Sequence, residues 1–245
     1  MEPWLQVGDD RLVAYFQRYR VENEPDVLRG ELLTKPDGCS TPESYFSCLP
    51  IVDQFAILEW HLRLSAELAE LCQAIVSINI HNSMIESEDG QQRLLSLLAA
   101  HPVSVTLEFT ETYPMPQIDA SNRLLRGIRE LGHFSALDDF GTGFNEMSLL
   151  TDFDFDVIKI DQSLSANLAT DPGRQRSLGH LAKILDVLGK DHVVEGVESE
   201  DVYQLLVDIG FVTFQGFLFH APERVTDVCP IVQSETIIPL LTIQS

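Results

Sequence analysis

Two adjacent aspartates, Asp138 and Asp139, follow a short apolar run and precede a turn that contains Gly141 and Gly143. Neighbouring side chains of a strand point to opposite faces, so two consecutive acids converge on one target only where the strand ends and the backbone turns. The two glycines supply that conformational freedom. The pattern indicates either a metal-binding pair of carboxylates with a mobile loop behind it, or a solvated acidic turn.

Polar side chains also stand at the ends of most other predicted strands. They are Glu31, Asn79, Glu108, Glu111, Lys159, Asp161, Glu195, Glu198 and Gln215. In a β/α barrel the carboxyl ends of the strands form one mouth, where active sites lie. Carboxylates gathered there cannot all be charged without compensation. Oxygen ligands with an amide suit Mg²⁺ or Mn²⁺ better than Zn²⁺, and a shared aspartate suits two-metal hydrolysis of a phosphate ester.

Several of these residues have an alternative structural interpretation. Asn79 fits a satisfied polar group at a strand end, and Glu111 fits a surface acid. Lys159 lies between two isoleucines, where its alternative role is an ion pair with Asp161. Glu108 lies between Leu107 and Phe109, where an unpaired charge is costly, so metal binding is the better explanation. The seven histidines form no HxxxH or HxH pattern and are interpreted as surface or core residues.

Hydrophobic periodicity predicts how the chain positions these groups. Two strands, 12–19 and 27–33, are expected to pair antiparallel across a polar turn. Further strands are predicted at 74–80, 103–109, 134–137, 157–160, 193–194 and 211–214. Helices are predicted at 51–71, 91–100, 119–131 (capped by Asp119 or Ser121), 172–188 (capped by Asp171), 201–209 and from Pro222 onward. About eight strands in this alternating order predict an α/β fold with a closed β/α barrel, in one domain covering residues 1–245.

Composition narrows the classes of function. The formal net charge is −22, which argues against a general binder of DNA, RNA duplexes or anionic membranes. If the substrate is a phosphate ester, cations must therefore lie between it and the acids. The four cysteines match no zinc pattern and are expected to be reduced thiols in a cytoplasmic protein. No apolar run suggests a secretory signal or a membrane span.

Taken together, these segments resemble the EAL domain, the bacterial cyclic-di-GMP phosphodiesterase, from about residue 15 to residue 222. The strongest motif is DDFGTG at 138–143. Other motifs follow the family order: VSINI at 76–80, LEFTE at 107–111, IKID at 158–161, EGVE at 195–198 and QGFLF at 215–219. The resemblance implies a TIM-like (β/α)8 barrel with an antiparallel first strand, in a standalone domain that is expected to form a homodimer.

The resemblance also implies hydrolysis of cyclic-di-GMP to linear pGpG with two Mg²⁺ or Mn²⁺ ions, in bacterial signalling that controls biofilm formation or motility. The implied ligands of one ion are Glu31, Asn79, Glu108 and Asp138, and those of the second ion are Asp138, Asp139 and Glu195. The implied catalytic residues are Glu31, Glu195 and Lys159, of which Lys159 holds or activates water. The resemblance implies substrate contacts for Leu33, Lys35 and Gln215, and support of the loop and the metal side by Glu111, Asp161, Glu198, Gly141 and Gly143.

The sequence departs from the family in its name-giving motif. The family has Glu-Ala-Leu-x-Arg, whereas this chain has Glu31-Leu32-Leu33-Thr34-Lys35. Lysine cannot offer the bidentate fork of arginine to a phosphate. We expect substrate binding to be weaker by ~1–2 kcal/mol, as for a charged hydrogen bond. The alternative function is a weak or inactive EAL domain that acts as a cyclic-di-GMP receptor or binds a protein partner.

Overall fold

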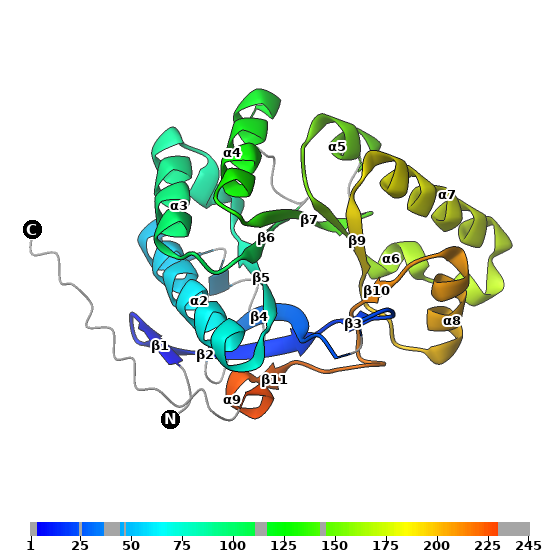
Figure 1. Cartoon of the computed structure of the whole chain (residues 1–245), viewed down its shortest axis with the longest axis horizontal. Helices are drawn as coiled ribbons and strands as arrows, with labels where there is room; N and C mark the ends of the chain where they lie inside the picture. The colour runs from blue at the N-terminus through cyan, green and yellow to red at the C-terminus, as the bar shows by residue number, and fades with distance from the viewer. Residues whose placement is uncertain are drawn as a thin grey trace, which may run out of the picture.

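The computed structural model describes residues 4–24, 26–36, 45–46, 48–110, 117–142 and 146–229. Among the residues singled out above, Glu111, Gly143 and Cys39 lie outside these ranges. Within the described part, one sheet curls into a ring and helices surround its outer face (Figure 1). The predicted α/β architecture is therefore confirmed.

The greater part of the ring consists of parallel strands that are neighbours in sequence order. They are β4 (Arg29–Pro36), β5 (Ile75–Ile80), β6 (Val105–Thr110), β7 (Phe134–Phe140), β8 (Val157–Ile160), β9 (Asp191–Val194) and β10 (Thr213–Phe214). Parallel order places all of their carboxyl ends at one mouth, which is the arrangement that the sequence predicted.

The first strand runs against the others and closes the ring. Strand β2 (Asp10–Arg18) pairs antiparallel with β4, and β3 (Arg20–Val21) pairs antiparallel with β10. Only Tyr19 separates β2 from β3, so both ends of the row belong to one chain segment. Two strands that the sequence did not predict, β1 (Trp4–Val7) and β11 (Glu223–Arg224), pair with β2.

The helices lie within a few residues of their predicted positions, with shorter ones between them. They are α2 (Ile51–Cys72), η1 (Asn82–Ile85), α3 (Glu88–Ala100), α4 (Ile118–Glu130), α5 (Glu146–Asp152), α6 (Gln162–Ser165), η2 (Leu168–Thr170), α7 (Pro172–Leu188), α8 (Glu200–Ile209) and α9 (Val225–Val228). None of the helices in the described residues is long and apolar enough to cross a bilayer. The helix expected from Pro222 begins only at Val225, because the two residues before it pair with β2.

A capping side chain marks the start of α7 but not the start of α4. The Asp171 carboxylate accepts hydrogen bonds from the amides of Gly173 and Arg174, as expected for the cap of α7. The predicted cap of α4 is wrong. This helix begins one residue earlier, after Gln117, and no side chain there caps it. Amide groups at a helix start have other partners available, so a capping residue nearby in sequence does not fix the first turn.

Alternation along the strands decides which side chains enter the ring. Leu107 and Phe109 of β6 are fully buried in the apolar core, and Ile158 and Ile160 of β8 are buried in the same way. The residues between them, Glu108 and Lys159, therefore point into the ring, because successive side chains alternate between the two faces. A polar residue inside an apolar strand thus becomes an interior group of the barrel.

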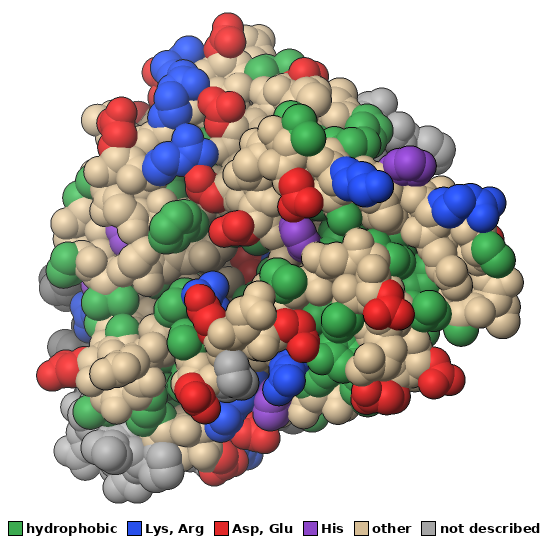
Figure 2. All heavy atoms as spheres, turned by 45° about the vertical axis from the view of Figure 1, so that its right-hand side comes forward, with side chains coloured by type: hydrophobic (Ala, Val, Ile, Leu, Met, Phe, Trp, Pro, Cys, Tyr) green, Lys and Arg blue, Asp and Glu red, His purple; other side chains and the backbone are tan. Residues whose placement is uncertain are grey.

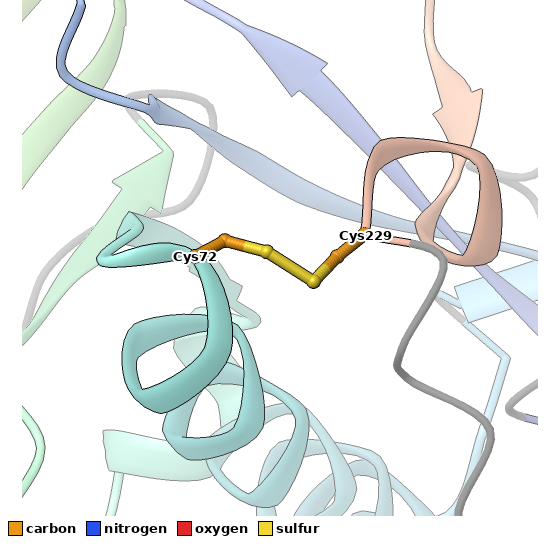
Figure 3. Close-up of a disulfide and its surroundings, with 2 residues drawn as sticks. All are labelled: Cys72 and Cys229. Carbon is orange, nitrogen blue, oxygen red and sulfur yellow. A yellow bond between two sulfur atoms is a disulfide. The ribbon is translucent and has the colours of Figure 1, made fainter.

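A disulfide bond corrects the expectation for the cysteines. Cys72, the last residue of α2, is bonded to Cys229, which follows α9 (Figure 3). The prediction of reduced thiols is wrong for these two residues. They lie 157 positions apart, and their Cα atoms come within 6.7 Å only through the packing of distant segments. Spacing in the sequence cannot show such a pair. Cys48 is free and exposed.

Candidate active site

Lys159 lies at the centre of four carboxylates that come from different strands. Its Nζ is 2.8 Å from Glu108 Oε2, 2.8 Å from Glu195 Oε1, 3.0 Å from Asp138 Oδ1 and 3.5 Å from Glu31 Oε2. The lysine side chain is only 2% exposed. Lysine is seldom buried unless it is paired, and here the ring places one ammonium group among four acids. We call Glu31, Glu108, Asp138, Asp139 and Glu195 the acidic cluster.

Glu31 receives further hydrogen bonds from two amides. Asn79 Nδ2 donates to its Oε1, and Gln215 Nε2 donates to its Oε2 at 2.8 Å. Burial raises the pKa of Glu31, but Lys159 and these amides outweigh burial and leave the pKa below its ordinary value. Strand β4 continues to Pro36, so Glu31 lies inside a strand rather than at its end. It still joins the predicted group, because its side chain faces the ring interior.

A break in the strand register brings the two adjacent aspartates together. Strand β7 continues through both of them, and its pairing with β8 shifts between Leu137 and Phe140. Asp139 has a φ of +58°, a left-handed conformation that is uncommon outside glycine. The required freedom was predicted for the glycines, but Asp139 itself makes the turn. Gly141, at φ +118°, leaves space for Leu164, whose side chain a Cβ would meet at 2.6 Å.

The acidic cluster carries more negative charge than one lysine can offset. Burial raises the pKa of Glu195 to about 8, although Lys159 opposes the shift. Burial and the charge of Asp138 raise the pKa of Asp139 to about 6, and burial raises that of Glu108 well above its ordinary value. Burial lowers the pKa of Lys159, but the surrounding carboxylates outweigh burial and hold the pKa above its usual range.

Divalent cations fit this site by charge and by type of ligand. Carboxylate oxygens of Asp138, Asp139 and Glu195 all lie within 4.8 Å of one another. Asn79 adds an amide oxygen beside Glu31, within the same mouth. Hard oxygen donors of this kind suit Mg²⁺, Mn²⁺ or Ca²⁺, and a cation would supply the charge that the cluster lacks.

Two of the predicted supporting residues, Asp161 and Glu198, form no ion pair with Lys159 in the described part of the chain, although the charge of Asp161 helps to raise the pKa of Asp139. The alternative ion pair between Lys159 and Asp161 is wrong, since Lys159 contacts the cluster and the Asp161 carboxylate accepts from the amide of Ser163 at the start of α6. Glu198 is exposed, three residues beyond Glu195. Of the remaining loop residues, Glu111 and Gly143 are outside the described ranges.

The candidate substrate residues of β4 stand further toward the mouth than Glu31. Leu33 and Lys35 are both half-buried. The ammonium group of Lys35 lies 5.0 Å from the centre of the Tyr15 ring, which is a cation–π distance. Tyr15 therefore helps to orient the Lys35 side chain.

Two residues of the site were not predicted from the sequence: Gln17, which lies in β2, and Tyr19, which follows β2. Gln17 accepts a hydrogen bond from Gln215 Nε2 at 3.1 Å, and Tyr19 donates to Glu108 Oε1 at 3.0 Å. Gln17 also pairs in register with Glu31. Gln17 lies in β2 and Tyr19 follows two positions later, whereas Ala14 and Phe16, at the alternate positions of β2, are core residues. A polar residue at every second position of that apolar stretch was the available signal.

Known proteins are similar to most of this chain. Residues 50–222 match the model of the EAL domain family. Cyclic di-GMP phosphodiesterase RocR of Pseudomonas aeruginosa is 32% identical over 234 residues, covering 88% of this chain and 59% of RocR. Cyclic di-GMP phosphodiesterase PdeB of Shewanella oneidensis is 28% identical over 190 residues, covering 75% of this chain and 22% of PdeB. The chain thus spans only part of the length of these relatives.

Solved structures support the same fold. The EAL domain of Mycobacterium smegmatis DcpA has a TM-score of 0.70 at 23% identity, covering 89% of this chain and 94% of that one. Klebsiella pneumoniae BlrP1, in a complex with calcium and cyclic di-GMP, has a TM-score of 0.76 at 26% identity, covering 87% of this chain and 56% of that one. The TIM-like barrel predicted from the sequence is therefore confirmed.

Proposed function

Because the chain belongs to the EAL domain family, we propose that it hydrolyses one phosphodiester bond of cyclic di-GMP and releases linear pGpG. One observation carries the proposal: the barrel gathers five carboxylates and a buried lysine at the mouth where β/α barrels hold their active sites. A substrate that is itself anionic needs cations at such a mouth, and the acidic cluster is suited to hold them.

We assign the cluster residues to two cation positions. Glu31, Asn79, Glu108 and Asp138 hold one Mg²⁺ or Mn²⁺ ion, and Asp138, Asp139 and Glu195 hold the second. When bound, the ions supply an activated water and stabilise the charge that develops on the phosphate. Asp138 belongs to both sets, which is supported by its contact with Lys159 and by the closeness of its carboxylate, within 4.8 Å, to those of Asp139 and Glu195.

Lys159 acts on the attacking water in this proposal. Its ammonium group lies within hydrogen-bonding distance of the cluster, so it can orient a water molecule bound among the same oxygens. Gln215, fixed by Glu31 and Gln17, contacts either that water or the substrate. Leu33 and Lys35 contact the dinucleotide further out along β4. The homodimer implied by the family resemblance stays a prediction.

A second candidate is a receptor that binds cyclic di-GMP with little turnover. The contact between Lys35 and Tyr15 favours it, because the phosphate contact of the family is here a lysine held against a ring. The two candidates differ in turnover and not in binding.

A turnover assay with a metal series separates them. Purified protein is incubated with cyclic di-GMP and Mg²⁺, Mn²⁺ or Ca²⁺, and pGpG is quantified by chromatography. We expect product with Mg²⁺ or Mn²⁺ and none with Glu31→Ala. Glu59→Ala is the matched control, since it removes a glutamate from a surface pair with Arg63 on α2. Binding in Ca²⁺ without turnover in any metal would favour the receptor, and robust turnover by Glu31→Ala would refute the assigned site.

A further inference from the structure

Glu108 is the most enclosed carboxylate of the acidic cluster, with no exposed surface. Each of its two oxygens has a separate partner. Oε2 accepts from Lys159 Nζ at 2.8 Å, and Oε1 accepts from the Tyr19 hydroxyl at 3.0 Å. Lys159 is shared among four carboxylates, whereas the hydroxyl of Tyr19 donates to Glu108 and has a second side-chain hydrogen bond with Ser77.

A cavity of about 280 Å³ lies beneath Glu108, on the side of the ring opposite to the strand carboxyl ends. Its wall near Glu108 consists of small side chains, among them Ser77, Thr106 and Ala136. Barrel interiors are usually filled at this level by layers of bulky branched residues. Figure 2 shows the surface hollowed near the middle of this face, between charged side chains. Packing therefore gives Glu108 little support from below.

Tyr19 lines this cavity, and its side chain reaches Glu108. It is the single residue between β2 and β3, at the seam where the ring closes. The backbone amide of Tyr19 donates to the carbonyl of Arg29 at 2.8 Å, which fixes the backbone that carries the tyrosine side chain. The side chain is thus anchored at one end by the seam and at the other by Glu108.

We propose that Tyr19 is a positioning residue for the metal site: it holds Glu108 Oε1 and leaves Oε2, which contacts Lys159 in this structure, as the oxygen that a cation would bind. The inference rests on the proposed function, because it assumes that the acidic cluster binds divalent ions. A carboxylate held at one oxygen loses less freedom when its other oxygen binds an ion, since its orientation is already fixed.

Tyr19→Phe removes the hydroxyl and keeps the ring. Loss of a hydrogen bond to a metal ligand typically weakens metal affinity by about 10- to 100-fold. Water in the cavity can reach Glu108 once the hydroxyl is gone, so we expect a loss near the lower end, about tenfold. An excess of Mn²⁺ should restore the turnover number, because Tyr19 does not contact the reacting atoms.

Tyr203→Phe is a matched control. The Tyr203 hydroxyl also donates to a glutamate, Glu22, but this pair lies away from the acidic cluster. Affinity for Mn²⁺ and Ca²⁺ is measured by calorimetry on substrate-free protein, and thermal melting is recorded for each variant in EDTA. Both substitutions are expected to lower the melting temperature slightly, while only Tyr19→Phe weakens the affinity for cations.

The outcomes separate this inference from the proposed function. If the wild type binds neither cation, the proposed function fails and the inference fails with it. If the wild type binds and Tyr19→Phe binds with equal affinity, only the inference is overturned. It is also overturned if Tyr203→Phe weakens cation binding as much as Tyr19→Phe, because the effect would then follow from general destabilisation. Weaker binding by Tyr19→Phe alone, rescued by excess Mn²⁺, supports it.

Discussion

Lys159→Met should make the metal-free protein depend on divalent cations for its stability. Methionine fills a similar volume but leaves Glu108, Glu195, Asp138 and Glu31 without the ammonium group that lies 2.8–3.5 Å from each of them. Removing one partner of a buried ion pair typically costs about 3–5 kcal/mol, because an uncompensated charge stays buried. For a chain of 245 residues this corresponds to a fall in melting temperature on the order of 10 °C.

The measurement is urea unfolding followed by circular dichroism, in EDTA and in Ca²⁺. In EDTA we expect the full loss of about 3–5 kcal/mol in the free energy of unfolding. A cation at about 100 times its Kd adds roughly 2.7 kcal/mol to any protein that binds it only when folded. The gain should be larger for Lys159→Met than for the wild type, since no ammonium group competes for the same oxygens.

Lys190→Met is the control for the loss of a partly buried lysine. The Lys190 ammonium group donates to the carbonyls of Phe153 and Phe155, at 3.1 and 2.8 Å, and contacts none of the cluster. We expect its substitution to cost about 1–3 kcal/mol, with the same gain from Ca²⁺ as the wild type. If Lys159→Met is as stable as the wild type in EDTA, or gains no more from Ca²⁺ than Lys190→Met, the ammonium group does not offset the charge of the cluster.

Three further predictions concern other parts of the molecule. Cys229→Ser should lower the free energy of unfolding by up to about 5 kcal/mol, from the closure entropy of a 157-residue loop, while Cys48→Ser should leave it unchanged in the same urea titration. Burial lowers the pKa of His61 to about 3, whereas the ordinary value is 6.5. Below pH 6.5 the imidazole therefore binds a proton in the unfolded chain but not in the folded protein. The free energy of unfolding should fall by about 2 kcal/mol between pH 7 and pH 5. Unfolding curves of His61→Gln should show a smaller loss over that range. Lys35→Arg should offer the phosphate a bidentate guanidinium fork and lower the KM for cyclic di-GMP about 5- to 30-fold in steady-state kinetics. An unchanged KM would show that residue 35 does not contact the phosphate.

The acidic cluster was predictable because charge inside an apolar strand is costly. Glu108 and Lys159 each stand between two large apolar residues, and such positions need a partner. Because the strands were predicted to be parallel, both residues were expected at the same mouth. Their place in the site could therefore be predicted without knowing any contact between distant residues. The same reasoning predicted the barrel, since alternating strands and helices bury apolar faces on the outside of the ring.

Features that depend on distant packing were not predictable in this way. The sequence does not show that Cys72 meets Cys229, or that Tyr19 reaches Glu108 across the ring. The turn at Asp139 was expected from the glycines that follow, because only glycine adopts a left-handed conformation at little cost. The register shift against β8 imposes that conformation on the aspartate instead, and a shift between strands is a property of the pair rather than of either sequence.

The two roles that we propose for Lys159 are consistent with each other in physical terms. Without cations, its ammonium group offsets the charge of the acidic cluster and allows the barrel to close around buried carboxylates. In the proposed reaction, cations would supply that charge, the carboxylates would need the ammonium group less, and the group would become available to orient a water or a phosphate oxygen. We therefore infer that the residue that stabilises the metal-free fold is also the one best placed to act on the substrate. This explains why a lysine occupies the centre of the cluster: an apolar residue there would leave the carboxylates unpaired without cations, and could not orient water with them.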